Sequence, residues 1–418
     1  MLFNELNLNR DLLRGIADKG FTLLTPVQEQ TLVATLQGRD VAVMSQTGTG
    51  KTAAFLITLF DRLLAHRDSP RNKALVIAPT RELAIQIEGE ARILGYHLDF
   101  RIGCFYGGVG YKAQEAMLRT GVDVIIGTPG RLLDFSDKGL LKLKEVGFLV
   151  IDEADRLFDM GFMPDLRKLF GKLPEPGKRQ SMLFSATLSR LARRLAADHL
   201  RHPEYIEVTP EQLTVDTVSQ ELYFVKSHIK ANLLIGLLLK HNPRNALIFV
   251  NMRHVAFRLA KSLQANGFHS RHLTGDLPQA DRLKVVRDFS SGKIPFLVAT
   301  DVAARGLHIE GLEMVINYDL PQDFENYVHR IGRTARAGLS GKAISLASEG
   351  TADHLQAIEK YIGMSIPVLT ATMDLFPVDK SLEHPAERGH DPRSSGSHRS
   401  GSGFRRGDSQ RRPTPRRR

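Results

Sequence analysis

A candidate phosphate-binding loop, SQTGTGKT at 45–52, is the clearest chemical signal in the sequence. It follows a short apolar run and precedes a segment with helical periodicity. A loop that holds nucleotide phosphates needs glycines for close backbone approach, a helix N-terminus, a lysine, and a hydroxyl that can hold Mg²⁺. Lys51 supplies the lysine and Thr52 supplies the hydroxyl. Ser45 occupies the position that is glycine in the strict pattern. The context predicts a nucleotide site, and a glycine-rich turn without a ligand is the alternative.

Two adjacent carboxylates, Asp152 and Glu153, follow the apolar run at 148–151 and open the sequence D-E-A-D. A parallel strand delivers such residues to the carboxyl edge of its sheet, where Asp152 and Thr52 can hold Mg²⁺, partly through water. Glu153 is then placed to orient or deprotonate an attacking water molecule. A solvated acidic turn is the alternative, which the preceding apolar strand disfavours.

Three arginines, Arg330, Arg333 and Arg336, lie close together far downstream of the loop. Phosphoryl transfer needs positive charge against the transferred and leaving phosphates. A solvated helix face, the alternative, would normally interleave acids, and none occurs between Arg330 and Arg336. The sequence therefore predicts a site split between two parts of the chain, which must close for hydrolysis.

Short apolar runs alternate with helical patterns along most of the chain. Near-continuous apolar strands covered by helices predict parallel sheets buried on both faces, and the rhythm starts afresh after the middle of the chain. The sequence therefore predicts two α/β domains. The predicted strands are 40–44, 74–79, 122–127, 148–153 and 181–187 in the first domain, and 246–251, 270–275, 296–301, 314–319 and 342–347 in the second.

The predicted domains span 1–207 and 220–370, joined by a linker at 208–219 within a stretch (204–220) that lacks helical periodicity. Apolar periodicity stops near Pro377, and 371–418 is predicted to be a disordered Arg/Gly/Ser-rich tail because it cannot bury enough surface to offset its ordering entropy. The formal charge of +11 is concentrated there, since residues 392–418 hold nine arginines and one acid. The tail therefore has the composition of an RNA tether, with a solubilising segment as the alternative.

The composition excludes several classes of protein. Hydrophobic residues make up 42% and charged residues 25% of the 418 residues, which is ordinary globular usage. No apolar run approaches the ~18 residues that a membrane span needs, and the first residues lack the order of a signal peptide. The single cysteine, Cys104, excludes an intramolecular disulfide and is expected to be a buried small hydrophobe. These features indicate a reducing, cytoplasmic setting with no membrane partner.

Taken together, the motifs resemble those of the DEAD-box ATP-dependent RNA helicases of superfamily two, over roughly residues 1–365, and most of all the bacterial RhlB-type subgroup. Residues 20–28 resemble the adenine-reading Q motif, with Phe3 as the isolated upstream aromatic, and 45–52 and 152–155 match motifs I and II. The resemblance implies two tandem RecA-like domains and RNA-stimulated ATP hydrolysis coupled to local unwinding of short duplexes. The other matching segments are 79–83, 107–108, 128–131, 185–187, 247–251, 274–276, 300–308 and 329–336.

The resemblance also implies a role for each matching residue, with ATP and Mg²⁺ as cofactors. Phe21 would stack on adenine and Gln28 would hydrogen-bond its edge. The catalytic residues would be Lys51, Asp152, Glu153, Arg333 and Arg336. The ATP-binding residues would be Phe21, Gln28, Ser45, Gln46, Thr47, Gly48, Thr49, Gly50, Lys51, Thr52 and Gly306. The RNA-binding residues would be Thr80, Arg81, Gly108, Thr128, Arg131, Thr274 and Thr300. The residues coupling the domains would be Asp155, Ser185, Thr187, His329 and Arg330.

The chain departs from the family pattern at three positions. Leu24 replaces a usual proline in the Q motif, and Ala335 replaces a common glycine between the arginine fingers. His308 replaces an aspartate near the ATP ribose. Because RhlB-type proteins resemble this sequence at His308, we interpret the histidine as a subgroup trait that leaves the ribose contact open.

RNA is the implied partner, bound without strong sequence preference because backbone contacts carry little sequence information. The residues outside 392–418 carry a net charge of only +3, so we expect positioned groups rather than a broad positive field. The subgroup resemblance also raises partnership with an RNA-degrading endonuclease complex through the second domain. Two alternatives remain: a DNA-directed helicase of the same superfamily, and a non-enzymatic RNA clamp or scaffold.

Overall fold

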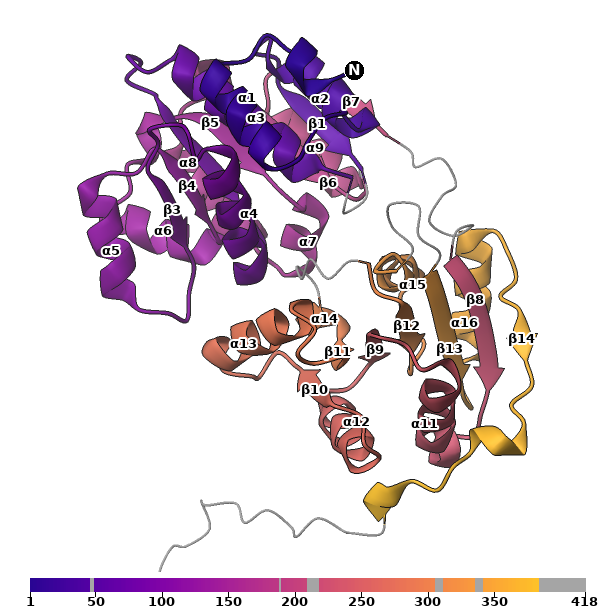
Figure 1. Cartoon of the computed structure of the whole chain (residues 1–418). Helices are drawn as coiled ribbons and strands as arrows, with labels where there is room; N and C mark the ends of the chain where they lie inside the picture. The colour runs from indigo at the N-terminus through magenta and orange to yellow at the C-terminus, as the bar shows by residue number, and fades with distance from the viewer. Residues whose placement is uncertain (46–48, 188, 209–217, 305–310, 335–340, 383–418) are drawn as a thin grey trace, which may run out of the picture.

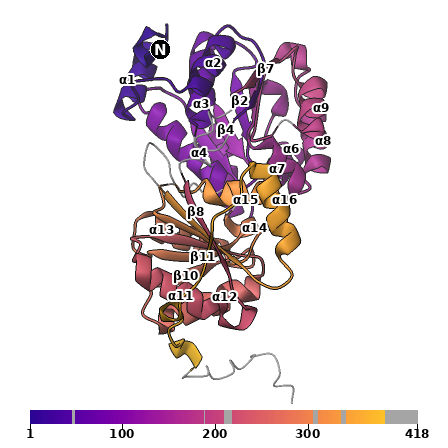
Figure 2. The same ribbon diagram turned by 90° about the vertical axis from the view of Figure 1, so that its right-hand side faces the viewer.

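Two seven-stranded parallel sheets form the framework of the protein, one in each half of the chain. The computed structural model describes residues 1–45, 49–187, 189–208, 218–304, 311–334 and 341–382. In Figure 1 the first α/β unit lies at the upper left and the second at the lower right, and Figure 2 shows the first above the second. The architecture confirms the predicted fold class of two tandem RecA-like domains.

The strand order of the first sheet groups the strands that precede the candidate site residues. Because every pairing is parallel, all carboxyl ends lie along one edge. The order across the sheet is β3 (Ile102–Phe105), β4 (Val124–Gly127), β2 (Lys73–Ile77), β5 (Val146–Ile151), β6 (Gln180–Ser185), β1 (Val41–Met44) and β7 (Glu204–Glu207).

Alternating strand residues bury both faces of this sheet. Val41 and Val43 face one helical layer while Ala42 faces the other, because successive side chains point to opposite faces of a strand. The first layer contains α1 (Arg10–Asp18), α2 (Pro26–Thr35), α3 (Lys51–Ala65) and α4 (Arg81–Leu94). The second contains α5 (Tyr111–Thr120), α6 (Pro129–Asp137), α7 (Ala154–Asp159), α8 (Met163–Lys172) and α9 (Arg190–His199).

The second sheet repeats this plan. Its order is β10 (Ser270–Leu273), β11 (Phe296–Thr300), β9 (Ala246–Val250), β12 (Met314–Asn317), β13 (Gly341–Ala347), β8 (Val218–Phe224) and β14 (Val368–Leu369). One face is covered by α11 (Lys230–His241) and α12 (Arg253–Ala265). The other is covered by α13 (Gln279–Ser290), α14 (Asp301–Ala304), α15 (Phe324–Ile331) and α16 (Ala352–Ile362).

The stretch at 204–220, which lacks helical periodicity and contains the predicted linker at 208–219, includes strand residues at both ends. It contains β7, which pairs with β1, and the start of β8, which pairs with β13. Only Ile206 is buried in β7, so the strand is too polar and too short to be seen as an apolar run. The described chain therefore leaves the first sheet after β7 and enters the second at Val218.

The predicted disordered tail also begins too early, because residues 371–382 pack on the second domain. Two short 3₁₀ segments, η5 (Met373–Leu375) and η6 (Lys380–Leu382), lie against α11 and α12. Leu375 is buried, and the Asp379 carboxylate accepts hydrogen bonds from Ser262 (2.8 Å) and Asn266 (2.7 Å). A few anchoring contacts hold this segment, and such contacts leave no periodic pattern in the sequence.

Several predictions fall outside the described residues. They concern Gln46, Thr47, Gly48, Gly306, His308, Ala335 and Arg336, the linker at 209–217 and the tail from 383 onward. Among the residues that are described, Cys104 is buried in β3 as expected. Within the same ranges, no helix has both the length and the apolar character to cross a membrane.

Candidate nucleotide and RNA site

The candidate phosphate-binding loop connects the carboxyl end of β1 to the N-terminus of α3. Gly50 caps α3 with φ of 91°, a left-handed conformation that favours glycine. Lys51 begins the helix, is buried, and donates a hydrogen bond from Nζ to the Ser45 carbonyl. Burial lowers the pKa of Lys51, while the charges of Asp152 and Glu153 act in the opposite direction. The lysine is therefore held inside the loop, close to both candidate acids.

The Q-motif segment is bonded directly to this loop. The Gln28 side chain accepts from the Thr25 amide (2.9 Å) and donates from Nε2 to the Gly50 carbonyl (3.2 Å). The Thr25 hydroxyl donates to the Thr49 carbonyl at 2.8 Å. A Cβ at Gly50 would lie 2.4 Å from Gln28 Nε2, so the close approach of these segments requires glycine.

Phe21, predicted to contact adenine, is partly buried in the first core. Its ring stacks on Phe3 with centroids 5.9 Å apart and planes 18° apart. Phe3 itself is buried, so the upstream aromatic supports Phe21 from the protein interior. This contact fixes one face of the Phe21 ring. Its adenine contact stays a prediction.

The two adjacent carboxylates lie at the carboxyl end of β5, as the sequence predicts. Asp152 Oδ1 accepts the Glu153 amide at 2.9 Å, and Glu153 has φ of 49° at the N-cap of α7. Glu153 Oε2 forms an ion pair with Arg156 Nη1 at 2.8 Å, and both side chains are buried. Sequence reasoning missed Arg156, although its position one helical turn beyond Glu153 was a usable signal.

Asp155 connects α7 to the segment that follows β6. Its Oδ1 accepts from the Ser185 hydroxyl (2.9 Å) and from the Ala186 amide (3.3 Å), and its own amide donates to Ser185 Oγ (3.2 Å). α7 is therefore hydrogen-bonded directly to Ser185 and Ala186 at the end of β6. This geometry fits the coupling role proposed for Asp155 and Ser185.

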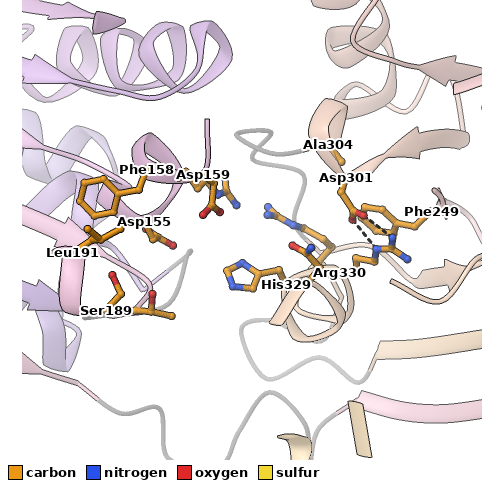
Figure 3. Close-up of a pocket in the computed structure, with 14 residues that line it drawn as sticks. Asp155, Phe158, Asp159, Ser189, Leu191, Phe249, Asp301, Ala304, His329 and Arg330 are labelled. Carbon is orange, nitrogen blue, oxygen red and sulfur yellow. Dashed lines mark hydrogen bonds and ion pairs between the residues drawn. The ribbon is translucent and has the colours of Figure 1, made fainter. Parts of the chain in front are cut away.

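A cavity of about 240 Å³ lies between the two domains and is lined by both. Figure 3 shows Asp155 on the first-domain side and His329 and Arg330 on the second-domain side. Thr187 and Arg333 also line it, whereas Lys51, Asp152 and Glu153 lie outside its lining. The structure thus brings four of the five candidates for coupling, together with Arg333, around one space, while Ser185 lies outside the lining and is bonded to Asp155. This arrangement is consistent with a site divided between two domains.

Arg330 has a structural role that the sequence did not predict. Its side chain is 1% exposed, and its guanidinium forms a bidentate ion pair with Asp301 at 2.7 and 2.6 Å. Further hydrogen bonds reach Asn251 Oδ1 (3.0 Å), Asn317 Oδ1 (3.2 Å) and the Asp319 carbonyl (2.6 Å). Arg330 therefore ties α15 to the ends of β9, β11 and β12, and positions its neighbour His329 at the cavity.

The candidate RNA residues follow a different group of strands. In the first domain they come after β3, β4 and β2, which are neighbours, whereas the candidate nucleotide residues come after β5 and β1 and the candidate coupling residues after β5 and β6. In the second domain they follow β10 and β11, the first two strands of the order. Each sheet edge is therefore divided into two regions. Among the RNA-side residues, Thr80 and Thr128 cap helices and Thr300 ends β11. Gly108 and Thr274 lie in the loops that follow β3 and β10.

The two candidate RNA-binding arginines are both held in place by neighbouring groups. Arg81 Nη1 donates to Gln279 Oε1 of the second domain at 3.1 Å. The Arg131 guanidinium lies over the rings of Tyr111 (5.2 Å) and Phe135 (5.5 Å). Within the described part of the chain, Arg131 Nη1 is buried without a hydrogen-bond partner. That N–H could be satisfied by an acceptor such as a phosphate oxygen.

A contact between the domains lies beside these residues and was missed by the sequence analysis. Glu82 Oε1 accepts from Gln279 Nε2 (3.0 Å) and from Arg282 Nε (2.5 Å), and the Glu82 and Arg282 side chains are largely buried. Arg282 also donates to the Ala303 carbonyl at 2.7 Å. Glu82 and Arg282 are 200 residues apart, so no local spacing could have paired them.

The comparisons with known proteins cover both α/β units. The family model described as DEAD/DEAH box helicase matches residues 25–195, and that described as Helicase conserved C-terminal domain matches 229–338. The chain is 43% identical over 410 residues to a Shewanella denitrificans protein named ATP-dependent RNA helicase RhlB, covering 96% of this chain and 95% of the relative. A protein of the same name from Shewanella amazonensis is 44% identical over 417 residues, with the same coverage. The solved structure described as S. cerevisiae Dbp5 bound to RNA and ADP BeF3 is similar with a TM-score of 0.79 and 31% identity, covering 88% of this chain and 95% of that one.

Proposed function

Because this chain belongs to the DEAD/DEAH box family and is similar over almost its whole length to RhlB-type ATP-dependent RNA helicases, we propose that it couples ATP hydrolysis to local unwinding of short RNA duplexes. The observation that carries this proposal is the cavity lined by Asp155 and Thr187 from one domain and His329, Arg330 and Arg333 from the other. A site built in this way is sensitive to domain closure. RNA that bridges the two domains would therefore regulate hydrolysis.

In the proposed mechanism, ATP phosphates occupy the loop after β1. There Lys51 would exchange its bond to the Ser45 carbonyl for bonds to phosphate oxygens. The Thr52 hydroxyl and Asp152 carboxylate are hard oxygen donors of the kind that Mg²⁺ prefers, and the carboxylates whose charges act on Lys51 give the site the negative charge that suits a divalent cation. Bound Mg²⁺ would neutralise charge on the phosphates. Gln28 and Phe21 would select adenine.

Glu153 is proposed as the group that orients or deprotonates the attacking water. Arg156 bonds to Oε2 of Glu153, so we propose that Oε1 is the oxygen that contacts this water. Arg333 and Arg336 would stabilise charge on the transferred phosphoryl group once the domains close. Arg330, buried in the second domain, would act by positioning His329 and Arg333 rather than by touching phosphate.

Single-stranded RNA is proposed to cross the carboxyl edges of β2, β3 and β4 and then those of β10 and β11. Hydroxyls, backbone amides and the two arginines at this edge suit contacts to phosphate and 2′-hydroxyl groups, which are tolerant of sequence. One bound strand would be bent as the domains close, and its complement would be released.

The deciding experiment is steady-state ATP hydrolysis by the full chain without nucleic acid, with single-stranded RNA, and with single-stranded DNA of matching sequence. We expect strong stimulation by RNA and little by DNA, because closure is proposed to depend on 2′-hydroxyl contacts. Equal stimulation by DNA would favour the DNA-directed alternative. Absence of turnover in every condition would favour the RNA clamp.

Deleting residues 392–418 should raise the RNA concentration needed for half-maximal ATPase activity by about tenfold at low salt. The deletion removes nine arginines, which are proposed to hold RNA phosphates near the domains. Binding of the truncated chain should also depend less steeply on salt, since fewer counterions are released. Titrations at two salt concentrations check both effects. RNA binding that is identical with and without the tail would support a merely solubilising segment.

We also propose, from similarity to RhlB-type helicases alone, a contact between the second domain and an RNA-degrading endonuclease complex in the cytoplasm. Affinity capture on the full chain tests this contact. Capture that recovers no ribonuclease would count against it.

A further inference from the structure

Positive charge is concentrated in one part of the second domain. No acidic residue occurs between Glu221 and Asp276, although the residues before the tail are almost balanced in charge. The stretch therefore has an excess of eight positive charges that the overall balance conceals. Its bases are Lys226, Lys230, Lys240, Arg244, Arg253, Arg258, Lys261 and Arg271.

Acids from other segments neutralise only some of these charges. Lys230 pairs with Asp319 at 3.0 Å, and Arg244 pairs with Glu313 at 3.2 Å. By contrast, the cations of α12 and β10 are exposed, and none forms an ion pair with another residue in the described ranges. A helix surface that is merely exposed to solvent usually carries acidic residues three or four positions from its basic residues. These unpaired cations are Arg253, Arg258, Lys261 and Arg271.

An exposed aromatic ring lies among these cations. Phe257 of α12 is 44% exposed, and Met252 at the start of the helix is 58% exposed. The His272 ring of β10 meets the Phe257 ring edge-on, with centroids 5.3 Å apart and planes 84° apart. Lys261 Nζ lies 4.5 Å from the centre of the same ring. Phe257 is thus held in a fixed orientation while much of its surface remains accessible.

This surface is continuous with the candidate RNA edge. α12 packs along β10, as Figure 1 shows, and β10 ends directly before Thr274. The Thr274 hydroxyl and the charge of Arg253 both lower the pKa of Asp276, so Arg253 lies near that loop. From Arg253 to Lys261 the helix extends for ~12 Å. A strand leaving the Thr274 loop would therefore meet the cations and the ring in succession.

We propose that this α12–β10 face, made of Met252, Arg253, Phe257, Lys261, Arg271 and His272, binds single-stranded RNA that continues from the Thr274 loop. The cations hold phosphates and Phe257 stacks on a base, which is the combination that sequence-tolerant single-strand binding uses. Lys261 is exposed and can move from the ring to a phosphate. The inference rests on the proposed function and lengthens its RNA track. It would add a local group of cations to the positioned groups expected from the sequence.

The test compares full-length variants in their binding to oligouridines of about 6 and about 20 nucleotides. Lys261→Gln combined with Arg271→Gln should reduce the advantage of the long oligonucleotide and lower its logarithmic salt slope by about 1.4. Affinity for the short one should be unchanged. Lys240→Gln combined with Lys360→Gln removes equal charge from exposed positions elsewhere in this domain, and should change neither quantity.

Phe257→Ala should weaken binding of the long oligonucleotide by about tenfold with the salt slope unchanged, and Phe257→Tyr should restore it. If the Lys261/Arg271 variant binds both oligonucleotides as the control variant does, this inference fails, and the face would suit an acidic protein better. RNA-stimulated hydrolysis would then still support the proposed function. A wild-type chain that binds neither oligonucleotide would overturn both.

Discussion

Replacing Glu153 with glutamine is expected to lower kcat for ATP hydrolysis by about 10²- to 10⁴-fold, the usual contribution of a positioned general base. Glutamine keeps the shape of the side chain and an oxygen that can still accept from Arg156, so the fold of α7 should persist. ATP and RNA binding should also persist, since neither depends on proton transfer. The variant should therefore hold RNA in the presence of ATP without turnover, which single-turnover hydrolysis and RNA release assays measure.

The buried Arg156 provides a control for this experiment. If Glu153 mattered only as the partner of Arg156, then Arg156→Gln would reduce hydrolysis as severely as Glu153→Gln. We expect Arg156→Gln to lower stability, because a buried ion pair is broken, while substantial hydrolysis remains. Full turnover by Glu153→Gln would contradict its assignment as the base.

Most of the fold could be predicted because its strands are buried on both faces. Runs such as 74–79 and 246–251 are nearly continuous in apolar residues, and this pattern follows directly from helices on both sides of a parallel sheet. The missed strands lack that pattern. β7 has a single buried residue, and β14 is two residues long. β8 mixes buried and exposed positions, and β3 is fully buried but only four residues long and includes Gly103. β7 and β14 are short edge strands that bury little surface, so their sequences carry a weak signal.

The site was predictable where chemistry depends on residues that are close in sequence. The loop at 45–52 and the carboxylates after β5 needed only local spacing and the rule that parallel strands end at one edge. The Arg330 network and the Glu82–Arg282 pair could not be found in this way. They join segments that are brought together by strand order, and strand order is a property of the whole sheet.

Replacing Arg330 with methionine is expected to lower the free energy of unfolding of the second domain by about 3–5 kcal/mol. The guanidinium is fully buried, and its loss removes the ion-pair partner of Asp301 and the Arg330 hydrogen bond to Asn317 Oδ1. Arg330→Lys should recover little of this loss, because an ammonium group cannot reproduce the two parallel bonds to Asp301. Arg287→Met, at an exposed arginine of α13, should change stability by no more than about 0.5 kcal/mol.

Hydrogen exchange measured on separate peptides is the suitable assay, because the two domains need not unfold together. Arg330→Met should accelerate exchange in β9, β11 and β12, whose ends the guanidinium joins, and leave β1 and β5 of the first domain unchanged. Hydrolysis should fall as well, since His329 and Arg333 would lose their support at the cavity. If hydrolysis fell while second-domain exchange stayed as in the wild type, Arg330 would have to act on the nucleotide directly. Its burial and its five hydrogen bonds within one domain argue for the positioning role instead.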